Sequence, residues 1–385
     1  MLTRTRTGAP ADPRAGDDSG WVLLAAIVAM LCTIGLMMVL SASSVEALRS
    51  YGGAWVFFQR QIVWVSIGTV ALGFAAWFDY HHWRRAVIPL LAVSALGLVL
   101  VLLPGVGITA GGSSRWLGTE SSRVQPSELA KLAVLLFAAD LLARRAELVG
   151  DWRCVMRPLL VTSGLVAGLV LLQPDMGTAM LMLFVVFILM FVGGVPLVSI
   201  SGISLAGGMA AVFVAKAESY RWERVASFRD PFRDFAGGGY QAAQSLVALG
   251  TGHVGGVGLG ASRAKWGFLP NAHTDFIFAI VGEELGIFGT VGVVGLFIAF
   301  AVLGVRTALR APDRFGALVA AGVTAWVCGQ AVVNMGAVTS LLPVTGVPLP
   351  FVSFGGSSLV VTMAAVGILL NVARQSRPAP AVRKG

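Results

Sequence analysis

Long apolar runs alternate with shorter polar segments along most of this chain. Between residues 21 and 371 we count about ten apolar runs of roughly 20 residues, the length that crosses a bilayer core of roughly 30 Å as an α-helix. The pattern predicts an all-α integral membrane protein with about ten transmembrane helices. Only one polar segment, residues 216–274, is long, and it precedes the eighth of the predicted helices.

The composition agrees with a membrane protein. Hydrophobic residues make up 56% of the chain, charged residues 12%, and the mean hydropathy is +0.82. We divide the chain into a polar N-terminal segment (1–20), a single polytopic membrane domain (21–372) and a tail (373–385). The first apolar run, 21–40, is longer than the core of a signal peptide, so we interpret it as a retained span.

Basic residues set the predicted orientation. They gather in short loops on the same side as both termini, which by the positive-inside rule places the two ends in the cytoplasm. The formal net charge of +9 therefore indicates orientation and not a nucleic-acid partner. The loop 216–274 then faces the outside, and residues 240–250 within it read as a short amphipathic helix at the membrane surface.

Asp275 is the acidic residue that we single out, at the start of the apolar run 276–303. An ionisable group at a span entrance is by default a functional candidate, because charge is costly at membrane depth. The competing interpretation is a helix cap, with Thr274 at the N-cap and Asp275 in the first turn. We predict a catalytic role because other polar groups gather at the same face.

Two further polar motifs begin spans at this outer face. Glu128 and Lys131 are three residues apart, so on a helix they are neighbours and are expected to pair, with Ser127 as the cap. Asp175 lies in a turn between two rather short apolar runs, where an acid either caps the next helix or belongs to a site.

Arg115 and Arg123 lie in the outer segment 104–125, against the charge bias of short outer loops. Cations kept there suit an anionic ligand such as a phosphate group, although anionic lipid headgroups are an equally simple explanation. His273 lies two residues before Asp275, and this pair is too small a cluster for a zinc site.

Glu283 and Glu284 follow Asp275 by eight and nine residues. On a straight helix they would lie about 12 Å deeper in the span than Asp275. At that depth at least one of the two carboxylates must face protein or water, because an ionised group in lipid is too costly. We expect them to be deep-span polar residues.

Taken together, the ordered motifs resemble those of the shape, elongation, division and sporulation (SEDS) family, the FtsW/RodA group of bacterial cell-wall polymerases. The resemblance covers nearly the whole chain except the first twenty residues and the tail. The motifs are Arg115-Trp116, Gln125-Pro126-Ser127-Glu128, Gln173-Pro174-Asp175-Met176-Gly177-Thr178, Gly239-Tyr240-Gln241, His273-Thr274-Asp275-Phe276, Gly282-Glu283-Glu284-Leu285-Gly286, the string 342–350 and Phe354-Gly355-Gly356-Ser357-Ser358.

The resemblance implies a peptidoglycan glycosyltransferase that polymerises lipid II at the outer face of the membrane. The family's essential aspartate falls on Asp275, which would act as general base while a sugar hydroxyl attacks an anomeric carbon with inversion. The leaving pyrophosphate would be stabilised by cations. The candidate substrate-binding residues are Arg115, Lys131, Arg123, Glu128, Asp175 and His273.

The resemblance also implies a class B penicillin-binding protein (a transpeptidase), other divisome proteins and membrane lipid as partners. It implies a location in the bacterial cytoplasmic membrane, with motifs that favour the FtsW division branch, at the septum, over RodA-type elongation. It makes a divalent cation, Mg²⁺ or Mn²⁺, plausible, but no ligand set can be read from the residues. The alternatives are a lipid-linked precursor transporter, whose essential polar groups would gather at the bilayer midplane, and a non-catalytic scaffold.

Overall fold

The computed structural model describes residues 19–110, 113–119, 123–216, 230–233, 235 and 237–376. Residues 1–18 of the predicted N-terminal segment and 377–385 of the predicted tail therefore lie outside the described residues, as does the stretch 217–229 of the long loop. The first residues of the predicted tail, 373–375, instead belong to α12. The described residues form eleven α-helices, which agrees with the predicted all-α class: α1 (Ser19–Tyr51), α2 (Val56–Trp77), α3 (Trp83–Leu102), α4 (Pro126–Arg144), α5 (Arg157–Leu171), α6 (Met176–Val192), α7 (Leu197–Lys216), α9 (Tyr240–Thr251), α10 (Ile277–Arg310), α11 (Arg314–Val338) and α12 (Gly356–Gln375).

Short elements join these helices. The segment between α3 and α4 forms a small antiparallel sheet in the order β1-β2-β3, which the sequence analysis did not foresee. The other short elements are single helical turns. The bounds are β1 (Ile108–Ala110), β2 (Ser113–Gly118), β3 (Arg123–Val124), η1 (Tyr80–His82), η2 (Ala146–Leu148), η3 (Trp152–Met156) and η4 (Ala264–Trp266).

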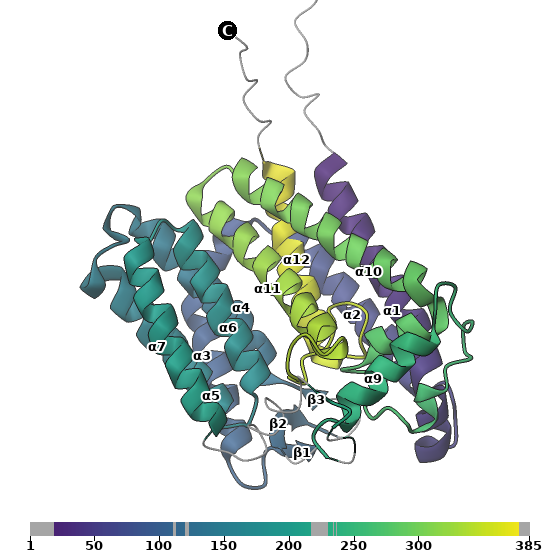
Figure 1. The fold of residues 1–385 in the computed structure, drawn as a ribbon. Helices are drawn as coiled ribbons and strands as arrows, with labels where there is room; N and C mark the ends of the chain where they lie inside the picture. The colour runs from purple at the N-terminus through teal and green to yellow at the C-terminus, as the bar shows by residue number, and fades with distance from the viewer. Residues whose placement is uncertain are drawn as a thin grey trace, which may run out of the picture.

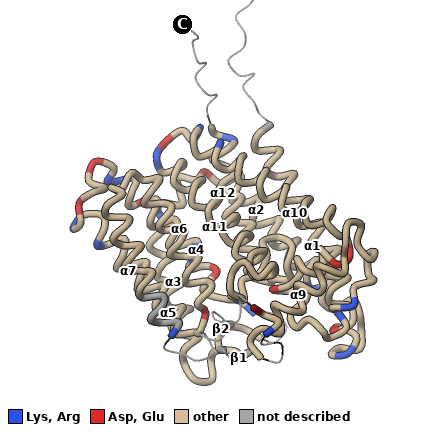
Figure 2. Tube along the Cα trace, viewed as in Figure 1, with Lys and Arg blue, Asp and Glu red and all other residues tan. Residues whose placement is uncertain are grey.

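The helices lie side by side in one bundle (Figure 1). The first residues of α1 and the last residues of α12 lie at the same face, the upper one in the view, whereas the sheet and α9 lie at the opposite face. Charged residues occur mainly at these two faces, with a largely uncharged band between them (Figure 2). This is the distribution expected of a membrane domain, with its apolar band toward lipid.

Within the described residues, seven helices are long and apolar enough to cross a membrane, and two shorter helices are also apolar. The prediction of a multi-pass membrane protein is confirmed, while the number of about ten spans and the sidedness of the two faces stay predictions. Helix α4 is not among these nine because its 19 residues include Glu128, Lys131, Asp140 and Arg144. These charges pair within the helix, Lys131 with Glu128 and Arg144 with Asp140.

Residues 339–355, which we call the central loop, connect α11 to α12, and most of their second half, from Val347, is buried among the helices (Figure 1). Phe351 and Val352 in this loop are buried, and a β-carbon at Gly35 would overlap their backbone. Gly35 is the middle residue of α1, a helix of 33 residues. The central loop therefore reaches about half-way along a helix that is about 50 Å long.

Helix α10 contains a sharp bend. Gly286 has φ 65° and ψ −155°, which is outside the helical region. A conformation with positive φ and extended ψ is essentially restricted to glycine. The amide of Ile287, freed by the bend, bonds to the carbonyl groups of His253 and Val254 at 3.1 Å each. The long loop thus packs into the bend, and the expected amphipathic helix, α9, packs beside it on α10 and α11.

Close packing between α2 and α12 depends on Gly367, and this can be tested. A β-carbon there would overlap the Leu72 carbonyl oxygen and lie 2.7 Å from Cβ of Ala75. We expect Gly367→Ala to lower the free energy of unfolding in detergent by about 1–3 kcal/mol through overpacking. The control is Gly292→Ala in α10, where a β-carbon meets nothing within 4 Å. Equal stability of the two variants would contradict this packing.

Candidate active site

Asp275 lies in a turn directly ahead of α10, and its side chain is half-buried. Helix α10 begins at Ile277 with Phe276 as N-cap, and no side chain caps it. The Thr274 hydroxyl instead donates to the carbonyl oxygen of Asn271 at 3.2 Å. The interpretation of Thr274 as the N-cap of this helix is therefore wrong.

The backbone that carries Asp275 is fastened by three consecutive hydrogen bonds. Each of its carbonyl groups accepts one bond from the central loop or from α11, so the peptide groups on both sides of the Asp275 α-carbon are fixed. The bonds are Phe354 N to His273 O at 3.0 Å, Ser353 Oγ to Thr274 O at 2.5 Å, and Asn334 Nδ2 to Asp275 O at 2.7 Å.

The central loop is held by side chains of the same group. Gln330 Nε2 donates to the carbonyl oxygen of Pro348 at 2.8 Å, and Asn334 Nδ2 to that of Val347 at 2.8 Å. A β-carbon at Gly346, where φ is 73°, would lie 3.8 Å from Asp275 Oδ2. The Asp275 carboxylate thus lies beside the central loop at a position where the loop has no side chain.

His273 packs next to this segment. Its ring lies 4.7 Å from the ring of Phe57 and 5.8 Å from that of Phe354, centroid to centroid. Its Nδ1 is 3.3 Å from Oε2 of Glu46, near the end of α1. The structure therefore gives His273 an aromatic packing role that joins α1, α2 and the central loop, while its predicted role in substrate binding stays a prediction.

The predicted pair of Glu128 and Lys131 is present at the start of α4. Lys131 Nζ lies 2.9 Å from Glu128 Oε2, and both side chains are nearly fully buried. The ammonium group also lies 3.3 Å from Gln330 Oε1 and 4.9 Å from the ring centroid of Trp326. Pro126 is the first residue of α4, but no side chain caps the helix, so the prediction of Ser127 as cap is wrong.

Asp175 and Arg115 meet at the start of α6. Asp175 is the N-cap of α6, with Oδ1 accepting from the Thr178 amide at 3.1 Å, which confirms the capping interpretation. Its Oδ2 accepts from Gln125 Nε2 at 3.1 Å and lies 3.9 Å from Arg115 Nη1. The Arg115 guanidinium also donates to the carbonyl oxygens of Gln173 and Pro174. Arg115 therefore braces the α5–α6 turn, and its predicted binding of pyrophosphate stays a prediction.

This turn also borders the central loop. A β-carbon at Gly177 would lie 2.6 Å from a methyl group of Val347. The amide of Gln125 donates to the Ser357 hydroxyl, at the start of α12, at 3.0 Å. Arg123 lies in β3, close to this junction in the chain, and its Nε is buried without a hydrogen-bond partner among the described residues. The outer motifs identified in the sequence therefore converge around one loop.

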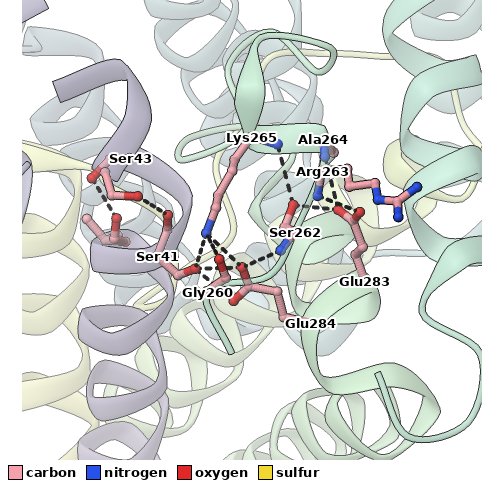
Figure 3. Close-up of polar contacts among 11 residues, drawn as sticks. Ser41, Ser43, Gly260, Ser262, Arg263, Ala264, Lys265, Glu283 and Glu284 are labelled. Carbon is pink, nitrogen blue, oxygen red and sulfur yellow. Dashed lines mark hydrogen bonds and ion pairs between the residues drawn. The ribbon is translucent and has the colours of Figure 1, made fainter. Parts of the chain in front are cut away.

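Glu283 and Glu284 lie in the first part of α10, three and two residues before the bend at Gly286. Both carboxylates are buried and face protein (Figure 3). Glu283 accepts bonds from the Ser262 hydroxyl and from the amides of Arg263 and Ala264, the last two at 2.8 and 3.3 Å. The carboxylate thus replaces solvent for three donors of the long loop.

Glu284 joins the same loop to α1. Its oxygens accept from the Ser41 hydroxyl at 2.6 and 2.8 Å, and Lys265 Nζ lies 3.3 Å from Oε1 (Figure 3). Lys265 also donates to the carbonyl oxygen of Gly260. Sequence reasoning missed Ser41 and Lys265, although two adjacent acids in an apolar run require partners and Lys265 is a basic residue of the long loop.

Sequence reasoning also missed Asn334, Gln330 and Ser353. The two amides of α11 lie four residues apart in an otherwise apolar helix, so they share one face with Trp326. That spacing was an available signal. Among the described residues, no three His, Cys, Asp or Glu side chains gather as a metal site. The predicted divalent cation therefore has no group of three or more such ligands in this part of the chain, and its binding stays a prediction.

Comparisons with known proteins bear on this arrangement. The family model FTSW_RODA_SPOVE, described as cell cycle protein, matches residues 22–378. The chain is 40% identical over 356 residues to stage V sporulation protein E of Bacillus subtilis (strain 168), covering 92% of this chain and 97% of that protein. It is 37% identical over 361 residues to a probable peptidoglycan glycosyltransferase FtsW of Geobacter sp. (strain M18), covering 94% and 98%.

Two solved structures are similar over 94% of this chain and 98% of theirs. A chain from the work entitled "Structural coordination of polymerization and crosslinking by a peptidoglycan synthase complex" has a TM-score of 0.71 at 30% identity. The rod shape determining protein RodA of Thermus thermophilus has a TM-score of 0.68 at 29% identity. The family match over almost the entire chain, together with a shared fold, shows that this protein belongs to the FtsW/RodA/SpoVE family of cell cycle proteins.

Proposed function

We propose that the protein is a peptidoglycan glycosyltransferase that polymerises lipid II at the outer face of the bacterial cytoplasmic membrane. The observation that carries this proposal is the half-buried Asp275 carboxylate, whose backbone is fixed by three hydrogen bonds beside the central loop. Relatives that are 37–41% identical are named probable peptidoglycan glycosyltransferases FtsW, which supports the same activity.

In the proposed reaction Asp275 is the general base. Its carboxylate takes the proton of the 4-hydroxyl group of a GlcNAc unit as the hydroxyl oxygen bonds to the anomeric carbon of a MurNAc unit. The bond from that carbon to the lipid pyrophosphate breaks, and the pyrophosphate leaves with the electron pair, which inverts the anomeric centre. A positioned base of this kind contributes a factor of about 10² to 10⁴.

The leaving pyrophosphate needs positive charge more than it needs an acid. We assign this role to Arg115, Lys131 and Arg123, in that order of preference. Arg115 is placed first because its side chain is partly exposed and lies against the turn 173–175. Lys131 takes the second place because its side chain is buried and paired with Glu128.

We propose a divalent cation, Mg²⁺ or Mn²⁺, only as an ion that binds together with the substrate pyrophosphate. Such ions commonly bind through one or two carboxylates together with substrate phosphates. Asp275 is the acid that would suit this arrangement, since it is half-buried and lies beside the central loop. No step of the proposed reaction depends on the ion.

We place the protein in septal cell-wall synthesis, with a class B penicillin-binding protein and other divisome proteins as partners. The support is that curated relatives named FtsW reach 41% identity, whereas the RodA structure shares 29%. The similar chain from a peptidoglycan synthase complex supports an assembly with a transpeptidase. RodA-type elongation remains the alternative, and complementation of cells depleted of either polymerase distinguishes the two.

The central prediction concerns Asp275→Asn. We expect glycan-chain formation from lipid II, by the purified protein with its penicillin-binding partner, to fall by about 10² to 10⁴ because the base is lost. The matched control is Asp151→Asn, at the opposite face, where the side chain accepts from the amides of Arg153 and Cys154. Asparagine caps such turns as well as aspartate does, so this variant should polymerise like the wild type.

Full polymerisation by Asp275→Asn would remove the general-base assignment. A wild-type protein that makes no chains but moves the precursor across a liposome membrane would instead identify a transporter. A wild type that binds its partner and does neither would identify a scaffold.

A second prediction separates the structural role of Lys131 from its proposed role in catalysis. Replacing Glu128 or Lys131 alone by Met leaves one buried charge unpaired, which should cost about 3–5 kcal/mol of unfolding free energy. Replacing both should cost much less, because neither charge is then left alone. The folded double variant should nevertheless polymerise more slowly than the wild type, since it lacks the cation.

The control for this experiment is Arg144→Gln on the same helix. Arg144 is 59% exposed, so the loss of its pair with Asp140 should change stability by no more than about 1 kcal/mol. A double variant at 128 and 131 that folds and turns over like the wild type would restrict the Glu128–Lys131 pair to a structural role.

A further inference from the structure

We infer that Asn334 and Ser353 are positioning residues for Asp275, which fix the peptide that carries the proposed base so that the rate of glycosyl transfer depends on them. The inference rests on the proposed function, because it assigns to these residues a task within that reaction. Neither residue needs to touch the substrate. Both act through the backbone of residues 274 and 275.

Asn334 connects two segments through a single nitrogen atom. Its Nδ2 donates to the carbonyl oxygen of Asp275 at 2.7 Å and to that of Val347 at 2.8 Å. A carboxamide nitrogen carries two hydrogen atoms, so each bond has its own hydrogen. The side chain is 1% exposed, which keeps water from replacing either bond. Aspartate or leucine at this position would have the size but neither donor.

Ser353 connects the same two segments one residue earlier. Its hydroxyl donates to the carbonyl oxygen of Thr274 at 2.5 Å and accepts from the Leu349 amide at 2.8 Å. The residue is 3% exposed. The peptide groups before and after the Asp275 α-carbon are therefore both held, and the carboxylate can move only by rotation about its own side-chain bonds.

The same loop is also linked, through Gln330, to Lys131, the second of the three proposed cations. Gln330, one turn from Asn334 on α11, donates to the carbonyl oxygen of Pro348 and lies 3.3 Å from Lys131 Nζ through its Oε1. Two adjacent loop residues are thus bound by two side-chain amides. Val347 is bound by Asn334, which also holds the Asp275 backbone, and Pro348 is bound by Gln330, which also contacts the Lys131 ammonium group. A displacement of a reacting group by 1 Å can lower a rate about a hundredfold, so this spacing matters for turnover.

The test measures steady-state polymerisation by the complex with the penicillin-binding partner, for Asn334→Ala, Ser353→Ala and a matched control. The control is Asn371→Ala, because Asn371 is also 1% exposed and its Nδ2 donates to the carbonyl oxygen of Ala76 at 2.7 Å, far from Asp275 in α12. Folded protein is quantified in each case, so that kcat refers to folded molecules.

We expect kcat to fall about tenfold to a hundredfold in Asn334→Ala and Ser353→Ala, with KM for lipid II within about twofold of the wild type. Asn371→Ala should lose stability but keep kcat. In an Asp275→Asn background, neither Asn334→Ala nor Ser353→Ala should lower the residual rate further, because residues that act through Asp275 have nothing left to position. Ser353→Ala removes only a hydroxyl group and serves if Asn334→Ala fails to fold.

Three results would overturn the inference. The first is an unchanged kcat in both variants, and the second is a loss of kcat as large in Asn371→Ala. The third is a further loss in the Asp275→Asn background, which would show that Asn334 and Ser353 act independently of Asp275. An inactive Asp275→Asn protein beside fully active Asn334→Ala and Ser353→Ala would refute positioning while leaving the proposed function in place. A wild type that never forms glycan chains would refute both.

Discussion

An irregular loop enclosed by helices must have its backbone polar groups hydrogen-bonded, and the centre of this protein is organised by that requirement. A buried amide or carbonyl group without a partner costs as much as a lost hydrogen bond, and within a membrane no water replaces it. The central loop reaches the midpoint of α1, and its needs are met by side chains of Gln61, Gln330, Asn334 and Ser353. The hydrogen-bonding requirement of the loop explains why otherwise apolar helices carry buried amide side chains.

Much of the architecture could be predicted because it depends on local sequence patterns. Apolar runs of sufficient length predict helices, and the amphipathic pattern of 240–250 correctly indicated α9. Proline and acid at the starts of α4 and α6 marked those helix ends, and the Glu128–Lys131 spacing predicted their contact. Asp275 was identifiable because a lone acid at a span entrance is costly without a reason.

The remainder could not be predicted because it depends on contacts between segments far apart in the chain. The donors to residues 273–275 come from 334, 353 and 354, and no local period indicates such partners. The bend at Gly286 was invisible in an apolar run with helical composition. The small sheet lies in a polar segment whose strands are too short to show an alternating pattern.

Two separate sets of buried contacts hold the chain on either side of Asp275. Glu283 and Glu284 bind residues 262–265, so the chain from 262 to 284 closes on itself, with Asp275 between the two ends. The far side of this closed segment is fastened separately, through the carbonyl groups of 273–275, to the central loop. Residues 262–265 are therefore held by carboxylates, whereas residues 273–275 are held by neutral amide and hydroxyl groups. The Asp275 carboxylate thus lies beside Gly346 in a segment whose carbonyl groups are held by residues outside the long loop.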